Sequence, residues 1–251
     1  TMSLTSAVGF VALFVVDLVD MLFISMLGID ELAAAIGFAG TILFMTTSIS
    51  IGMAIAGGSM VAKSLGQNKP QLATELLTHV LMVGVVFAVI FASVIYVNLH
   101  GLTALIGATG NTQELAVSYL KILIPSMPIL LVGIVASAAL RSHGAARLSM
   151  VVILVAGVVN AILDPIFIFT LDMGLEGAAW ASVVSRISMA MVAVWYLVSR
   201  YEGFSGLSFV AIRRDLKPIA AIAIPSMLAN IAAPIGGAYV IKVAAEFGES
   251  A

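Results

Sequence analysis

The sequence contains no cysteine and very few charged residues. Only 10% of its 251 residues are charged, whereas a soluble globular domain carries about 25%. So few charges cannot cover a surface that faces water, which excludes an ordinary soluble domain. The absence of cysteine excludes disulfides, thiol catalysis and zinc–thiolate sites.

Histidine and clustered positive charge are scarce as well. His79, His100 and His143 are far apart in the chain, so no metal-ligand spacing is present. Lysine and arginine occur mainly in short connections, which leaves no basic face for nucleic acid. We therefore expect no bound cofactor, no resident metal and no nucleic-acid partner.

Apolar residues are abundant and make up 62% of the chain. A membrane helix needs about 20 consecutive, mostly apolar residues. Six such segments and most of a seventh are predicted at residues 4–27, 33–62, 76–99, 115–140, 148–171, 177–198 and 218–245. The first is too long for a signal-peptide core and has no basic start, so we interpret it as a membrane helix. The predicted fold class is an all-α membrane protein.

The basic residues are distributed unevenly between the connections. The connections after the second, fourth and sixth segments hold Lys63, Lys69, Arg141, Arg147, Arg200, Arg213, Arg214 and Lys217. The other connections are mainly acidic and hold Asp30, Glu31, Glu114, Asp172 and Glu176. Because cytoplasmic loops carry the excess of lysine and arginine, the basic connections and the amino terminus are predicted to be cytoplasmic.

A weak internal repeat relates the two ends of the chain. Residues 26–33 (MLGIDELA) resemble residues 246–251 (EFGESA), and each segment follows an apolar helix. In this register the seventh helix corresponds to the first, as in transporters built from repeats. We therefore predict a six-helix bundle at residues 1–217 and the first helix of an incomplete second bundle at residues 218–251. The chain is expected to be about half of a transporter, and to need the missing bundle or, alternatively, a second copy of itself.

Three carboxylates, Asp17, Asp20 and Asp164, lie inside predicted helices. An aspartate at a helix centre costs about 2.5–3.5 kcal/mol on insertion scales, so such residues usually line an ion or substrate path. Asp17 and Asp20 share one face of the first helix, and Asn160 and Asp164 share one face of the fifth. Asp20 and Asp164 are each predicted to lie roughly 10 Å below the outer surface.

The predicted cluster is suited to binding a cation. Neighbouring carboxylates titrate as a coupled set, and Asn160 can hydrogen-bond a carboxyl group in either protonation state. A proton or a sodium ion fits such a set, and the sequence leaves both open. Pro165 removes a helical hydrogen bond beside Asp164 and is predicted to be a hinge. In the plainer alternative, Asp164 simply forms an ion pair with Arg186.

At these positions the chain resembles the multidrug and toxic compound extrusion (MATE) family over nearly its whole length. The similar segments, in the order of the family, are DLVDMLFISMLG (17–28), AKSLGQNKP (62–70), LRSHG (140–144), NAILDP (160–165) and GLEGAAWAS (174–182). The resemblance implies a twelve-helix antiporter of two six-helix bundles. Such a protein exports cationic or amphipathic small molecules across the cell (inner) membrane in exchange for protons or sodium ions.

The resemblance also assigns individual residues. It implies that Asp20 is the family's first-helix carboxylate. It implies further that Asn160 and Asp164 are the polar pair of the DinF-type and archaeal-like branch. Ser182 and Ser137 fall at or near positions where relatives carry polar residues, and we include both in the predicted coupling and substrate site.

Asp17 departs from the family, whose members often carry an uncharged polar residue there, so its role stays open. A lipid or lipid-linked oligosaccharide flippase of the same wider superfamily remains an alternative, but it is expected to show more basic cavity residues than Arg186. An intramembrane aspartyl protease would use two acids, but its Gly-x-Gly-Asp sequence is missing and Pro165 follows Asp164. We therefore predict a transporter surrounded by membrane lipid, not an enzyme.

Overall fold

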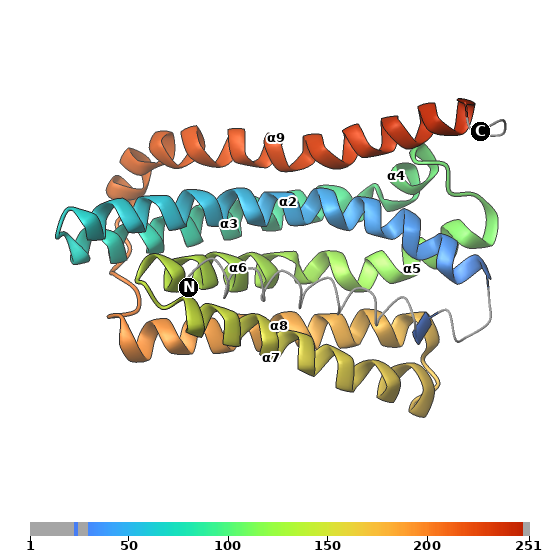
Figure 1. Cartoon of the computed structure of the whole chain (residues 1–251), viewed down its shortest axis with the longest axis horizontal. Coiled ribbons are helices and arrows are strands. Elements are labelled where there is room, and N and C mark those ends of the chain that lie inside the picture. Colours follow the sequence, from blue (N-terminus) through green and yellow to red (C-terminus); the bar gives the residue numbers. More distant parts are fainter. Residues whose placement is uncertain (1–22, 25–29, 248–251) are drawn as a thin grey trace.

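The computed structural model describes residues 23–24 and 30–247, with side chains at 23–24 and 31–232. Within this part of the chain the structure is helical and has no strand, which confirms the predicted all-α fold class (Figure 1). The elements are α2 (Asp30–Gly66), α3 (Pro70–Val97), α4 (Leu99–Leu105), α5 (Gly110–Leu123), η1 (Ile124–Ser126), α6 (Met127–Ser142), α7 (Ala146–Pro165), η2 (Ile166–Thr170), α8 (Gly174–Arg200) and α9 (Phe209–Phe247).

Six helical segments among the described residues are long and apolar enough to cross a membrane. They are Glu31–Gly66, Pro70–Val97, Gly110–Ser142, Ala146–Thr170, Gly174–Arg200 and Phe209–Ala232. Each overlaps one of the predicted segments from the second to the seventh, so these six predictions are confirmed. The predicted first helix, residues 4–27, lies outside the described residues except for Phe23 and Ile24, which are helical.

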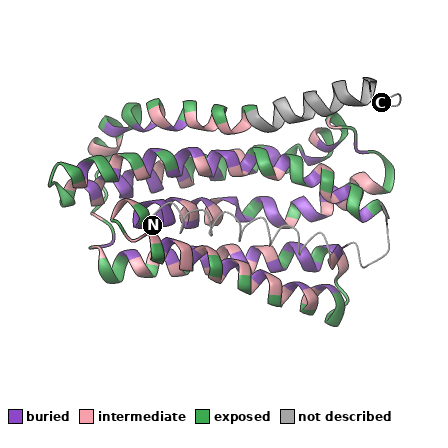
Figure 2. Cartoon of the chain, viewed as in Figure 1, coloured by how far each residue is buried: buried purple, intermediate pink, exposed green. Residues whose placement is uncertain are grey.

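The long helices lie side by side in a roughly antiparallel bundle (Figure 1). α2 packs against α3, α5, α6 and α9, while α8 packs against α5, α6 and α7. Buried residues line the inward faces of the helices, and exposed residues lie on the outward faces (Figure 2). Many of the exposed side chains are large and apolar, including Val86, Val158 and Trp195. Such outward faces suit contact with lipid tails, which are themselves apolar.

A short 3₁₀ turn, η1, divides the fourth predicted segment into α5 and α6. Pro125 and Pro128 carry no backbone N–H, so each removes one bond of the α-helical ladder. The N–H of Met127 bonds to the carbonyl of Ile124, three residues back. The carbonyl of Leu123 consequently becomes available to side-chain donors.

Two features of the helices differ from the prediction. The helix α4 has 7 residues, too few for an apolar period to reveal it. α9 begins at Phe209 rather than at the predicted Pro218, because Ser208 Oγ accepts a hydrogen bond from Ala211 N (3.4 Å) and caps the first turn. The predicted domain division at 217/218 therefore falls inside α9, and the division itself stays a prediction.

Candidate functional site

Asn160 and Asp164 form a buried polar pair on α7. Asn160 Nδ2 donates to Asp164 Oδ2 over 2.9 Å, and the two residues are only 4% and 0% exposed. Val158 and Ile162, on the other side of the same turns, are 56% and 55% exposed. α7 therefore turns an apolar face outward and its amide–carboxylate pair into the bundle, as the four-residue spacing predicts.

The helix type changes immediately after Asp164. α7 ends at Pro165, and the next five residues form the π-helix η2, which Leu171 N closes with a bond to Ile166 O (2.9 Å). Proline at 165 leaves the carbonyl of Ala161 without its helical donor. Single π turns inside helices occur frequently at functional sites. The predicted hinge at Pro165 thus has a structural basis, although its motion stays a prediction.

α8 fixes the position of the pair by packing closely on α7 and η2. Ser185 Oγ donates to the carbonyl of Ala156 over 2.8 Å. At the other end of the contact, a Cβ on Gly177 would lie 2.7 Å from the carbonyl carbon and oxygen of Phe167, so only glycine fits without a shift. These two contacts place Ser182, which lies between them on α8, at about the level of Asn160. The structure therefore brings Ser182 to the level of the predicted site.

Ser137 lies in a different polar cluster. It shares a 2.7 Å hydrogen bond with Ser149, to which Arg141 Nη1 also donates over 2.8 Å. Ser149 and Asn160 are separated by about 16 Å along α7, at 1.5 Å per residue. Ser137 is thus near the arginine-rich end of the bundle, and the structure does not bring it to the Asn160–Asp164 pair.

Arg186 of α8 binds the break between α5 and α6. Its Nη1 donates to Leu123 O over 3.1 Å and to Ser126 Oγ over 2.7 Å, while Ser126 Oγ donates to the same carbonyl over 2.7 Å. Leu123 O can accept the bond from Arg186 because the N–H of Met127 bonds to Ile124 O in η1 instead. The alternative, an ion pair between Arg186 and Asp164, explains neither of the two hydrogen bonds of Arg186.

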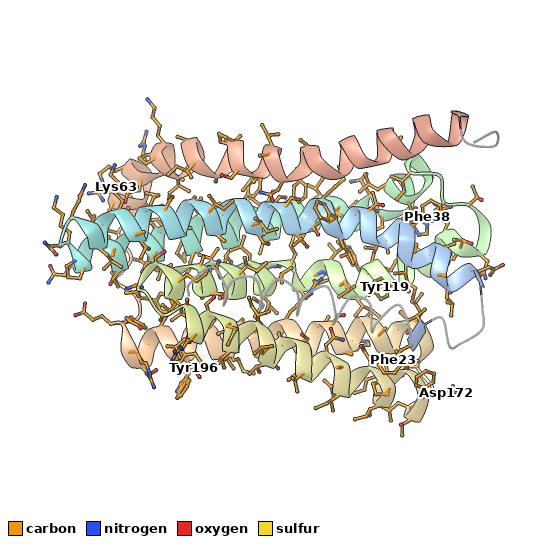
Figure 3. All side chains as sticks on the ribbon, viewed as in Figure 1. Phe23, Phe38, Lys63, Tyr119, Asp172 and Tyr196 are labelled. Carbon is orange, nitrogen blue, oxygen red and sulfur yellow. The ribbon has the colours of Figure 1, made fainter. Side chains whose placement is uncertain are left out.

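Asp17 and Asp20 lie outside the described residues, so their place in the predicted cluster stays a prediction. Phe23, which follows Asp20 by three positions, makes an edge-to-face contact with Phe169 of η2, with ring centroids 6.2 Å apart. Figure 3 shows Phe23 and Asp172 at one end of the bundle and Lys63 at the other. Phe23 of the predicted first segment therefore lies against the π-helix that follows α7.

A second buried polar cluster joins α3 to the start of α9. His79 and Asp215 are 0% and 5% exposed, and His79 Nδ1 lies 2.8 Å from Asp215 Oδ2. Arg214 donates to both carboxylate oxygens of Asp215, over 2.7 and 2.9 Å, and to Glu75 over 3.1 Å. Three potential metal ligands, from Glu75, His79 and Asp215, meet within 4.8 Å. Because the Arg214 guanidinium already supplies the positive charge to both acids, the cluster fits an ion-paired joint better than a metal site.

Sequence reasoning missed several polar residues of these clusters. Ser126 and Ser185 bond to neighbouring helices, and Tyr119 is a buried residue of α5. A lone serine in an apolar segment most often bonds to its own helix, so it gives little signal. His79 and Asp215 are separated by 136 positions, and nothing in the sequence pairs them.

Six apolar helices among the described residues, with polar side chains buried between them, define a multi-pass membrane protein. Residues 6–166 match the MatE family, and the chain belongs to that family. The predicted resemblance to MATE transporters is therefore confirmed.

Curated relatives match the chain from end to end. A FAD transporter of Shewanella oneidensis is 25% identical over 256 residues, covering 100% of this chain and 56% of that protein. Multidrug export protein MepA of Staphylococcus saprophyticus is 25% identical over 252 residues, covering 99% and 56%. The chain thus spans about half the length of the curated relatives it matches.

A solved structure shows the same fold. It is an outward-facing conformation of a multidrug resistance MATE family transporter of the MOP superfamily, and it superimposes with a TM-score of 0.90. Sequence identity is 24%, and the match covers 98% of this chain and 55% of that one. The six crossing helices and their order therefore correspond to about half of a MATE fold.

Proposed function

We propose that this chain provides the first bundle, and the first helix of the second, of a multidrug efflux antiporter in the cell (inner) membrane. The single observation that carries the proposal is the buried Asn160–Asp164 pair directly before the π-helix. A carboxyl group buried in a membrane-crossing helix is costly, and such groups commonly mark an ion or substrate path. The similarity to the staphylococcal multidrug export protein MepA supports the same activity.

The coupling site in this proposal consists of Asp164, Asn160 and Asp20, with Asp17 and Ser182 nearby. Without a bound proton or sodium ion, the carboxylates favour the state that accepts a cationic or amphipathic compound. Entry of a proton or sodium ion lowers the net negative charge by one and favours release of the compound on the other side. Such exchange requires that the two ligands prefer opposite states of the protein.

Ser137 has no role in the coupling step of this proposal because of its distance from Asn160. The proposed orientation keeps the lysine- and arginine-rich end in the cytoplasm. The second bundle is expected to complete the transport path, as the length of the relatives indicates.

A second candidate is export of an anionic compound such as FAD. The FAD transporter of Shewanella oneidensis favours it, as does the half-buried guanidinium of Arg186 in the middle of α8. The two candidates differ in the charge of the compound and share the coupling pair.

The test uses the protein expressed from its complete gene and reconstituted in liposomes. Ethidium or FAD is loaded, and a proton or sodium gradient is imposed one at a time. We expect ethidium efflux under one gradient in the wild type and its loss in Asp164→Asn. Asp172→Asn is the matched control, because Asp172 is an exposed aspartate in the turn before α8.

Other experimental results would contradict the proposal. FAD efflux without ethidium efflux would select the second candidate. Translocation of a labelled lipid without either solute would select the flippase alternative. Full ethidium efflux in Asp164→Asn would exclude Asp164 from coupling.

A further inference from the structure

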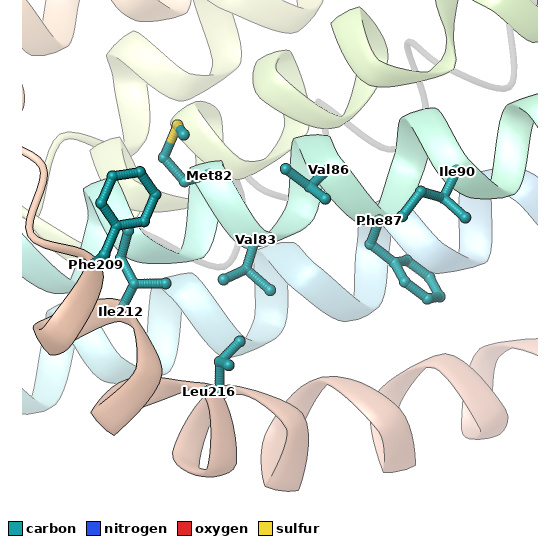
Figure 4. A pocket seen from close by; sticks show the side chains of 8 residues that line it. All are labelled: Met82, Val83, Val86, Phe87, Ile90, Phe209, Ile212 and Leu216. Atoms are coloured by element: carbon teal, nitrogen blue, oxygen red, sulfur yellow. The ribbon is translucent and has the colours of Figure 1, made fainter.

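An apolar groove runs along the outside of the bundle between α3 and the start of α9. It has a volume of about 360 Å³, and all of its lining side chains are apolar. Figure 4 shows the two sides of the groove, which include Val83, Phe87 and Ile90 on α3 and Phe209, Ile212 and Leu216 on α9. Nothing in this lining can orient a polar ligand, so the groove itself fits a hydrocarbon chain.

The groove lies on a surface that faces lipid. Phe87 and Ile90 are 43% and 58% exposed, and Phe209 at the start of α9 is 83% exposed. α3 and α9 both belong to segments of membrane-crossing length. Wherever the second bundle leaves this surface uncovered, the molecules that meet it in a membrane are lipids.

Two basic residues lie in the part of α9 that forms one side of the groove. Arg213 and Lys217 are exposed, lie one turn apart on α9, and directly follow the lining residues Ile212 and Leu216. In the described part of the chain neither forms an ion pair, whereas Arg214 between them is bonded to Asp215 and Glu75. Within the described part of the chain, two positive charges are thus available to a ligand.

Along the helix axes, the basic residues and the apolar lining of α3 are arranged like the headgroup and the acyl chain of an amphiphile. The bond between His79 and Asp215 sets the level at which α9 meets α3. From His79, α3 continues for about 16 Å to Ile90 at 1.5 Å per residue. The apolar lining on α3 therefore extends away from the basic residues toward the middle of the membrane, so a headgroup and a chain have separate places.

We propose that this groove binds an anionic phospholipid of the leaflet at the lysine- and arginine-rich end. One acyl chain lies between α3 and α9, and the phosphate contacts Arg213 and Lys217. The bound lipid fills the gap beside the His79–Asp215 joint and holds α9 against α3. A basic residue near an anionic lipid surface contributes about 1 kcal/mol.

The experiment measures lipid binding to the delipidated protein, expressed from its complete gene, by native mass spectrometry. The probes are dioleoyl-phosphatidylglycerol and dioleoyl-phosphatidylcholine, which share acyl chains and differ in net charge. We expect tighter binding of phosphatidylglycerol to one site. The double variant Arg213→Gln/Lys217→Gln should reduce that preference by about 30-fold, the equivalent of two such contacts.

Two further variants separate the headgroup and the groove. Val86→Trp places a larger side chain on the exposed lining, and we expect it to weaken binding of both lipids. Lys63→Gln/Lys69→Gln removes two exposed charges, one in the last turn of α2 and one in the connection to α3, and the preference should persist. Arg213→Lys/Lys217→Arg keeps both charges and should retain the preference, which checks that the glutamine variant fails through charge rather than folding.

The proposal would be overturned by equal binding of the two lipids to the wild type. It would also be overturned if Lys63→Gln/Lys69→Gln reduced the preference as much as the Arg213/Lys217 variant. The preference for the anionic lipid would then depend on the total positive charge at this end of the protein and not on two particular residues. Competition by inorganic phosphate without any effect of Val86→Trp would show a free-anion site instead. None of these outcomes depends on transport activity.

Discussion

Asp164 and Asp215 are both buried aspartates, but they lie in different surroundings. Asp215 stands where α3 meets α9, bonded by the guanidinium of Arg214 and the imidazole of His79. Asp164 lies on α7 and receives a hydrogen bond from the neutral amide of Asn160. An amide can serve a carboxyl group in both protonation states, whereas a guanidinium favours the ionised state alone. The comparison sets a fixed ion-paired joint at Asp215 against the carboxyl group of Asp164, whose charge changes in the proposed function.

The largest effect is expected from Asp164→Asn. The change keeps the shape of the side chain and removes its charge, so efflux driven by an ion gradient should fall by at least about 10-fold, within the range of coupling between linked sites. Thermal unfolding of the purified protein should stay close to the wild type. Gradient-driven dye efflux in liposomes measures the first quantity, and a thermal scan in detergent measures the second.

The next effect concerns stability, at Asp215. Among the described residues Asp215 is the hydrogen-bond partner of buried His79, whose Nε2 has none. Asp215→Ala should therefore lower the free energy of unfolding by about 1–3 kcal/mol, the cost of a buried polar group left unsatisfied. Asp215→Asn keeps an oxygen for His79 Nδ1 and should recover part of the loss. If Asp215→Ala abolished efflux at unchanged stability, the roles assigned to the two aspartates would be reversed.

An effect of similar size on stability is expected where α8 touches η2. Gly177→Ala places a methyl group within 2.7 Å of the Phe167 backbone, and relief of such overpacking costs about 1–3 kcal/mol. Because the added methyl group displaces the backbone of η2, which follows the helix of the Asn160–Asp164 pair, efflux should decline as well. Gly40→Ala is the control, since a Cβ there meets nothing within 4 Å and alanine favours the helix. Unchanged unfolding temperature in Gly177→Ala would show that α8 can move away from η2 freely.

The smallest effect is expected from Glu75→Gln. Its partner Arg214 has a side chain that is 59% exposed, and exposed ion pairs contribute little to stability. The unfolding temperature should remain that of the wild type, which sharpens the contrast with Asp215 in the same cluster. A loss as large as that of Asp215→Ala would mean that the cluster acts as one cooperative unit.

The crossing helices and the polar pair of α7 could be predicted because each depends only on residues that are close together in the sequence. An apolar run of membrane length and a four-residue spacing of Asn160 and Asp164 are visible without any tertiary structure. Contacts between distant segments could not be predicted in this way. The bond from Arg186 to Leu123 depends on how Pro125 and Pro128 redirect the helical ladder, and the pairing of His79 with Asp215 depends on where α9 returns to α3. Ser137 was included through resemblance, and its distance from Asn160 became visible only in the packed bundle.

The π-helix after Asp164 gives α7 an adjustable register. A π turn contains one residue more than the α turn that it replaces, so its conversion rotates the following side chains by about 100° around the helix axis. Phe169, which touches Phe23 of the first segment, lies within this turn. In the proposed function, a change of charge at Asp164 beside this turn would be converted into a rotation of one aromatic contact, and the helix that carries the carboxyl group would shift relative to its neighbour without breaking.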